Sequence, residues 1–271
     1  MTRAAQLFRH CGLVAVLVVP LVMASACATD YRNREMAEMH LRTGIASIES
    51  GQFTEALREL FEARRLNPDD PRVYYHLGVS YYARGMRGDA LSAFIRAVEL
   101  RPDYSEALNY LGLIRFEEKD YSGAISYFQK ALENILYDTP EFSLFNMGRA
   151  WREQRADDRA LSFFEEAARV RPNRILPLVL MNMGTLLLTM DRPDEALKHL
   201  RESVRMAPYV ADFRYALGEA FLAKGMTGDA VRELRRAIDL APESEAATKA
   251  RTILAILPPP DAAREQGRHS H

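Results

Sequence analysis

The side chains that most often carry enzyme or metal chemistry are few in this sequence, and their spacing does not bring them together. In the body of the chain His40, His76 and His199 lie far apart. There is no His-Glu-x-x-His, no Gly-x-Ser-x-Gly and no phosphate-binding Gly-Lys-Ser/Thr loop. His269 and His271 would bind a metal ion only weakly. We therefore expect no enzyme activity, no cofactor, no metal site and no small-molecule substrate.

The side chain best placed for covalent modification is the thiol of Cys27. A basic head is followed by an apolar run over residues 11–23 and then by the small residues Ala24-Ser25-Ala26, directly before Cys27. The run is shorter than the ~20 apolar residues that a bilayer-spanning helix needs. It therefore predicts a signal peptide that ends before the cysteine.

Two readings of the cleavage site remain open. The small residues satisfy an ordinary signal peptidase, but with Cys27 they also resemble a bacterial lipobox, in which the thiol is acylated and becomes the new N-terminus. Cys27 is the only cysteine left after cleavage, and a lone thiol beside the cleavage site favours lipidation over a disulfide. In that lipoprotein family the next residue sorts the chain. Ala28, in place of Asp, implies a lipid anchor on the periplasmic face of the outer membrane.

Composition and charge restrict the kinds of partner. The sequence is 48% apolar and 27% charged, which is ordinary for a folded domain. Removing residues 1–26 takes away two arginines and no acid, so the formal charge becomes 34 − 37 = −3. No basic excess is available to bind nucleic acid or an anionic bilayer. We expect no nucleic-acid partner and attachment to the membrane through the lipid alone.

A unit of about 34 residues recurs six times along the rest of the chain. Its glycine returns at steps of 34, 34, 36, 36 and 34 residues, as Gly44, Gly78, Gly112, Gly148, Gly184 and Gly218. A bulky apolar residue follows 16 positions after each glycine, as Leu60, Phe94, Phe128, Phe164, Leu200 and Leu234. An alanine precedes each bulky residue by four positions, and a proline closes five of the six units.

This pattern resembles the tetratricopeptide repeat, a pair of antiparallel helices joined by a tight turn. The resemblance implies an all-α fold, a right-handed superhelical solenoid of about six repeats. A further helix over residues 243–257 is expected to cap the last repeat. The expected domains are a signal peptide at 1–26, the lipidated cysteine with a short tether at 27–35, the array with its capping helix at 36–257, and a disordered tail at 258–271.

Two joints between repeats are longer than the regular spacing by two residues. After the third repeat, Asp138 or Thr139 makes a good N-cap with Pro140 at the first helical position. The fifth repeat is entered through a similar expansion that brings Pro177 close to a helix start.

The first helices of the repeats should line an inner groove. Positions −6, −3, +1 and +4 from each glycine share one helix face, and they are strongly apolar and aromatic in the central repeats. Each of these side chains could instead belong to the core, as apolar stripes at helical spacing usually do. Two asparagines at position −2 could hydrogen-bond a bound peptide backbone, or could be ordinary polar surface residues. The candidate partner-binding residues are Tyr75, Tyr82, Asn109, Phe116, Phe142, Phe145, Asn146, Arg149, Arg152, Met181, Asn182 and Tyr215. The same rule places Thr185, Leu188 and Glu219 in the groove.

The joint between repeats three and four carries a more specific resemblance. Tyr137-Asp138-Thr139-Pro140-Glu141, followed by Asn146-Met147-Gly148-Arg149-Ala150, is similar to the corresponding junction of the type IV pilus biogenesis lipoproteins called PilF, PilW or Tgl. Members of that family are pilotins, which promote localisation and multimerisation of secretin subunits in the outer membrane. The resemblance implies that the groove binds a secretin subunit. The alternative is a periplasmic lipoprotein adaptor that scaffolds peptidoglycan hydrolases or outer-membrane assembly components.

Overall fold

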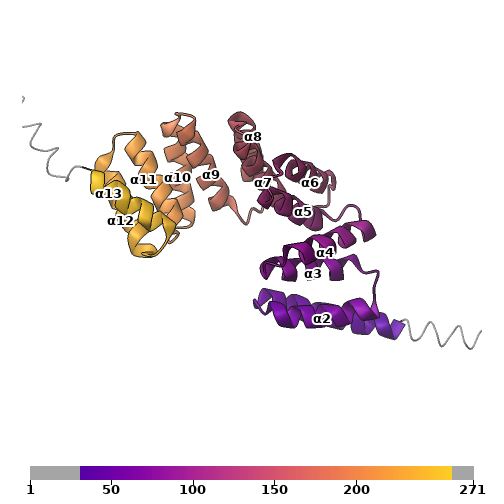
Figure 1. Cartoon of the computed structure of the whole chain (residues 1–271). Helices are drawn as coiled ribbons and strands as arrows, with labels where there is room; N and C mark the ends of the chain where they lie inside the picture. Colours follow the sequence, from indigo (N-terminus) through magenta and orange to yellow (C-terminus); the bar gives the residue numbers. More distant parts are fainter. Residues whose placement is uncertain (1–30, 258–271) are drawn as a thin grey trace, which may run out of the picture. The chain divides into compact units, whose positions relative to one another are not determined.

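The computed structural model describes residues 31–257, and throughout this range the regular secondary structure is helical, without strands. The first helix covers residues 31–49. The helices that follow (Figure 1) are α2 (Phe53–Leu66), α3 (Pro71–Ala83), α4 (Arg87–Leu100), α5 (Ser105–Glu117), α6 (Tyr121–Glu133), α7 (Pro140–Glu153), α8 (Asp157–Arg169), α9 (Leu176–Thr189), α10 (Pro193–Met206), α11 (Ala211–Ala223), α12 (Thr227–Leu240) and α13 (Glu245–Ile256).

In chain order the helices make six pairs and one closing helix, as the repeat pattern predicts. The contacts divide the chain into two compact units, Met1–Ile114 (unit 1) and Arg115–His271 (unit 2), and the boundary falls inside α5. Within unit 1, α3 packs on α4 and on α2. Within unit 2, α7 packs on α8, α9 on α10 and α11 on α12, while α13 covers α12 and α11. The predicted capping helix is therefore confirmed.

In repeats one, two, four, five and six, the two helices meet where the glycine of the repeat faces its bulky apolar residue. A Cβ built on Gly148 would lie 2.5 Å from Cδ1 of Phe164, and one on Gly78 would lie 2.5 Å from Cε1 of Phe94. These distances are far inside van der Waals contact, so only a residue without a side chain lets the two backbones approach this closely. Gly44, Gly184 and Gly218 meet Leu60, Leu200 and Leu234 in the same way.

The turn between the two helices of a repeat uses one left-handed residue. Gly51, Gly85 and Gly225 hold it with φ of 72°, 74° and 68°. Lys119 and Arg155 adopt φ of 63° and 60° at the same point of repeats three and four, and Asp191 does so in repeat five. The short left-handed C-terminus of the first helix is thus built without glycine in three repeats, at some cost in backbone energy.

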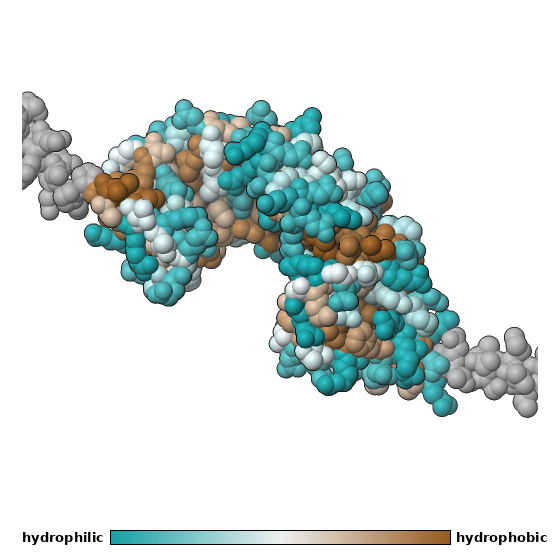
Figure 2. Space-filling view, viewed as in Figure 1, coloured by the Kyte–Doolittle hydropathy of each residue, from teal (hydrophilic) through white to brown (hydrophobic). Residues whose placement is uncertain are grey.

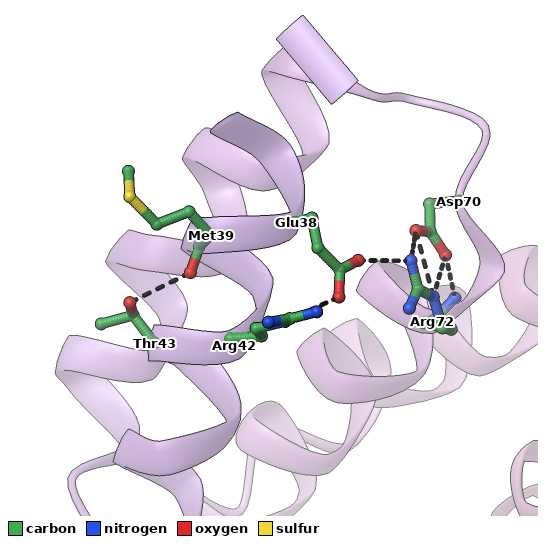
Figure 3. Close-up of polar contacts among 6 residues, drawn as sticks. All are labelled: Glu38, Met39, Arg42, Thr43, Asp70 and Arg72. Carbon is green, nitrogen blue, oxygen red and sulfur yellow. Dashed lines mark hydrogen bonds and ion pairs between the residues drawn. The ribbon is translucent and has the colours of Figure 1, made fainter. Parts of the chain in front are cut away.

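A network of charges joins repeat one to repeat two in unit 1 (Figure 3). Glu38 accepts a hydrogen bond from Arg42 at 2.9 Å and another from Arg72 at 2.8 Å. Asp70 caps α3 by accepting from the backbone N–H of Arg72, and the two side chains also form an ion pair at 2.6 Å. The hydrogen bond from Arg42, supported by Arg72, holds the pKa of Glu38 below its ordinary value.

The boundary predicted for the start of the array is wrong by several residues. The sequence predicts a tether over residues 27–35, but the chain is already helical at residue 31. No glycine or proline interrupts residues 31–43, so the helix continues beyond the segment that matches the repeat pattern. The signal peptide, Cys27 and the tail at 258–271 lie outside the described residues.

The other predicted boundaries near the long joints agree with the structure. Thr139 is the N-cap residue of α7 and Pro140 is its first residue. The joints α6–α7 and α8–α9 contain six residues, against four between α4 and α5 or between α10 and α11. Among residues 31–257, no helix is long and apolar enough to cross a membrane.

Replacing Gly148 by Ala should destabilise the protein by about 2 kcal/mol, because Phe164 must move out of the space that the new methyl group occupies. Gly88→Ala is the matched control, since a Cβ at Gly88 in the first turn of α4 meets nothing within 4 Å. The control should be neutral or should stabilise by up to ~1 kcal/mol. Urea unfolding followed by circular dichroism measures both. Equal effects of the two substitutions would contradict the close approach of α7 and α8.

Candidate functional site

Unit 2 contains an open groove of about 570 Å³ on the face formed by the first helices of repeats four, five and six. Its lining comes from α7, α9 and α11, which are the elements that the repeat pattern predicts on this face. The lining residues are Arg152, Met181, Asn182, Thr185, Leu188, Thr189, Glu219 and Ala223.

The floor of the groove is supplied mainly by α9, whose sequence LPLVLMNMGTLLLT contains no charged residue. One face of this helix is buried through Val179, Met183 and Leu186. Met181 and Leu188 remain partly exposed while packing against the same core. A helix that is apolar on nearly every side must expose some of that surface when only one side is covered, and in this case it exposes it to the groove.

Several polar side chains of the groove already make hydrogen bonds within the protein. Asn182 donates to the carbonyl of Leu178 at 2.9 Å, and the hydroxyl of Thr185 donates to the carbonyl of Asn182 at 3.0 Å. The hydroxyl of Tyr215 donates to Oε1 of Glu219 at 2.7 Å. Burial, together with this hydrogen bond, raises the pKa of Tyr215, so the phenol stays neutral and keeps Glu219 in place.

Arg152 is the cationic group of the groove. It is half-buried and makes no ion pair with any residue in the part of the chain that the structure describes. Trp151, the only tryptophan of the chain, precedes it, and the guanidinium of Arg159 lies 4.5 Å from the centre of the Trp151 ring. An arginine without a carboxylate partner beside an apolar floor can bind a carbonyl or carboxylate of a peptide.

The structure brings four of the predicted groove residues together. Arg152, Met181 and Asn182 line the groove. Tyr215 donates a hydrogen bond to Glu219, which also lines it. Thr185, Leu188 and Glu219, which the same face rule gave, also line it. Phe142 is partly exposed in the first turn of α7, outside the lining.

Three of the predicted residues are buried and do not line the open groove. Phe145 is 7% exposed and belongs to the core of unit 2, with its ring 5.7 Å from that of Phe164. Asn146 is 5% exposed and accepts a hydrogen bond from Arg149 at 3.2 Å. Asn109 in unit 1 is 8% exposed. Helical periodicity assigned these side chains to the right face, but it could not show that neighbouring groups cover that face.

Arg149 is engaged with neighbouring rings. Its guanidinium lies 4.5 Å from the centre of the Phe116 ring and 5.8 Å from that of Phe145. These cation–π contacts tie α7 to the end of α5 within unit 2. Phe116 and Arg149 therefore have a structural role at this position.

Tyr75 and Tyr82 lie in unit 1, in an aromatic cluster of α3, α4 and α5. Tyr75 is 5.0 Å from Tyr104 between ring centres, and Tyr82 is 5.4 Å from Tyr110. Tyr110 in turn stacks on Phe94 at 4.8 Å. Both predicted residues are partly exposed, but their ring contacts account for their positions as parts of the packing between repeats.

The sequence rule missed two lining residues, Thr189 and Ala223. Both stand five positions after the glycine of their repeat, one position beyond the last that the rule included. The sequence contains a signal that identifies them, because position +5 from the glycine is next to position +4 at the C-terminal end of the first helix. Among the described residues no group of three or more His, Cys, Asp or Glu side chains could hold a metal ion.

Comparison with known proteins agrees with this architecture. Residues 75–135 and 181–245 match a sequence model of the tetratricopeptide repeat, and residues 44–85 match a second model described as TPR repeat. Together the matches cover residues 44–135 and 181–245, more than half of the 271 residues. A search of curated protein sequences finds no significant match.

Solved structures with a similar fold share little sequence with this chain. PilF of Pseudomonas aeruginosa is 18% identical, with a TM-score of 0.72 over 81% of this chain and 98% of the other. PilW, described as a widely conserved type IV pilus biogenesis factor, is 17% identical with a TM-score of 0.71, covering 80% and 98%. YrrB, described as having an unusual peptide-binding site, is 22% identical with a TM-score of 0.53, covering 71% and 97%.

The aromatic cluster of unit 1 should make stability depend on pH through His76. Its ring lies 4.9 Å from that of Tyr75, and burial lowers the pKa of His76 to about 4. The unfolded chain, with a His pKa of ~6.5, binds the proton more readily, so stability is lost as pH falls from about 6.5 towards 4. The loss approaches ~3 kcal/mol below that window.

Urea unfolding of the wild type and His76→Phe at pH 7 and pH 4.5 measures this dependence. The variant should lose less stability than the wild type over that interval. A variant with the same pH dependence as the wild type would show that other groups cause it.

Proposed function

Because the chain belongs to the tetratricopeptide repeat family, we propose that it is a non-enzymatic protein-binding module whose binding site is the groove of α7, α9 and α11. The fold is one that generally serves protein–protein interaction. The observation that carries the proposal is the apolar floor of α9, exposed next to Arg152 in an open groove. A surface of this kind on a folded protein marks a partner site.

The groove suits a peptide segment with aliphatic side chains. Burying such side chains against Met181 and Leu188 would contribute roughly 1.5–3 kcal/mol for each fully buried residue. Arg152 would bind a carbonyl or carboxylate of the segment. Asn182 and Thr185 present polar atoms beside the same floor. The contacts together match an amphipathic helix or an extended strand laid in a preformed groove.

The more specific part of the proposal is that the protein is a pilotin of type IV pilus assembly. PilF and PilW share the fold, and PilW is described as a type IV pilus biogenesis factor. The junction motif around Thr139 and Pro140 and the lipobox-like Cys27 support the same role. Lipid on Cys27 would hold the protein on the periplasmic face of the outer membrane, and the groove would bind secretin subunits there. Tighter binding to subunits in their assembly-competent state would favour multimerisation.

Changing Met181 to Glu should reduce secretin multimers at least tenfold, because a carboxylate on the apolar floor costs ~3 kcal/mol of binding, or ~100-fold in affinity. The measurement is the amount of heat-resistant secretin multimer on a denaturing gel. Met206→Glu is the matched control, since Met206 on α10 is 40% exposed and lies outside the groove.

Normal multimers in cells that lack the protein would remove the pilotin role and would favour the adaptor role. If cells lacking the protein lose the multimers but cells with Met181→Glu keep them, secretin binds to a surface other than the groove. Loss of multimers with both Met181→Glu and Met206→Glu would indicate a general defect instead of a groove effect.

Changing Cys27 to Ser should abolish lipidation and release the protein from the outer membrane. Labelling with radioactive palmitate and separation of the membranes measure the two effects. Cys11→Ser, within the predicted signal peptide, is the control and should change neither. A Cys27→Ser protein that still fractionates with the outer membrane would show that the anchor is not a lipid on this thiol.

A further inference from the structure

The joint between α6 and α7 exposes two adjacent aliphatic side chains. Ile135 is 95% exposed and Leu136 is 81% exposed, and Ile135 is the most exposed large apolar residue in the described part of the chain. Neither residue lines the groove of unit 2. Because the two aliphatic side chains are adjacent, they form a contiguous exposed apolar patch, which is informative where a single exposed leucine is not.

Comparison with the other joints shows that the fold does not need apolar residues at these positions. Tyr137 donates its N–H to the carbonyl of Asn134 at 3.1 Å, as Tyr104 does to Arg101 at 3.1 Å in the α4–α5 joint. Residues 134–137 therefore form the same kind of turn as residues 101–104. Where the α4–α5 joint has Pro102 and Asp103, this joint has Ile135 and Leu136. The α2–α3 joint also has Pro-Asp, at residues 68–69.

The backbone of the loop is anchored on both sides of the apolar pair. On one side Ala131 is fully buried, and on the other Tyr137 is 8% exposed. The Tyr137 hydroxyl accepts a hydrogen bond from Ser143 at 3.3 Å. The Leu136 N–H donates to Oδ1 of Asn134 at 2.9 Å. Because the loop is anchored at both ends, docking the pair would order little additional backbone.

The charges around the loop indicate what kind of surface covers it. Glu133 and Asp138 are the charged residues nearest to the apolar pair in the sequence, and both are exposed; the nearest basic residues, Lys130 and Arg149, lie further away along the chain. Segments that insert into bacterial membranes carry basic residues, because the lipid surface is anionic. An acidic flank is repelled by such a surface, whereas it fits a protein pocket that has basic side chains at its rim.

We propose that Ile135 and Leu136 form a second docking site, which inserts into an apolar pocket rimmed by lysine or arginine on a partner protein. This site is separate from the groove, and it stands whether or not the groove binds a secretin. The aliphatic pair supplies the buried contact, while Glu133 and Asp138 fix its orientation against the basic rim.

The test places the photo-crosslinking residue p-benzoylphenylalanine at position 136 of the full-length protein in its own cells. The same residue at position 209 is the matched control, because Tyr209 is 84% exposed and stands at the equivalent point of the α10–α11 joint. The crosslinked product is identified by mass spectrometry. The identified protein is then purified, and its affinity for the wild type is compared with that for a variant.

The variant is Ile135→Pro with Leu136→Asp, which copies the joint at Pro102 and Asp103 and so should fold normally. Asn134 has φ of −79° and ψ of 109°, a conformation compatible with a following proline. Its melting temperature should match that of the wild type. The affinity for the identified protein should fall at least 30-fold. The wild-type affinity should weaken as ionic strength rises to about 1 M.

A discrete protein crosslink at position 136 that is absent at 209, with the loss of affinity and the salt dependence, supports the proposal. A crosslink to lipid or to a second copy of this chain overturns it in favour of that occupant. No crosslink at 136, while the same probe at Met181 gives one, also overturns it. So does an unchanged affinity of the folded variant.

Discussion

The close approach of glycine to a bulky apolar residue sets the geometry of five of the six repeats. Where Phe164 occupies the space beside Gly148, and Leu200 the space beside Gly184, the two helix backbones come closer than any side chain would allow. The helices of a repeat then act as one rigid pair. Stacking such pairs leaves one side of α9 covered by the core and the other side open between α7 and α11. The groove is therefore a consequence of the packing that stabilises the fold.

The repeat spacing was enough to predict the fold, because the glycine contacts are local and recur at a fixed distance along the chain. It also placed α7 correctly, since Thr139 and Pro140 carry a local signal for a helix start. Side-chain exposure was harder to predict. Phe145 lies on the groove-facing side of α7, yet its ring packs against Phe164, and no periodicity in α7 alone contains that information. The missed Thr189 and Ala223 lie just past the four positions that the rule allowed.

The two candidate binding surfaces of unit 2 differ in how they are built. The groove is recessed, and its apolar side chains are partly covered by the helices that supply them, so their sequence signal resembles that of the core. The loop at Ile135 and Leu136 projects its apolar pair into solvent. In the sequence this pair could belong to the end of α6 or to the segment that leads into α7. Only the exposed fractions of the two side chains show that they project into solvent. In Figure 2 another hydrophobic patch lies over the α13 end of the same unit, where Ile256 is 78% exposed.

The single tryptophan is an intrinsic fluorophore located in repeat four. Trp151 sits on α7, next to Arg152 of the groove and beneath the guanidinium of Arg159. Since the remaining aromatic side chains are tyrosine and phenylalanine, the indole fluorescence of the whole molecule comes from one repeat. A cation close to the ring tunes its emission wavelength. Spectra of the unmodified protein therefore report on the state of repeat four, with no label attached.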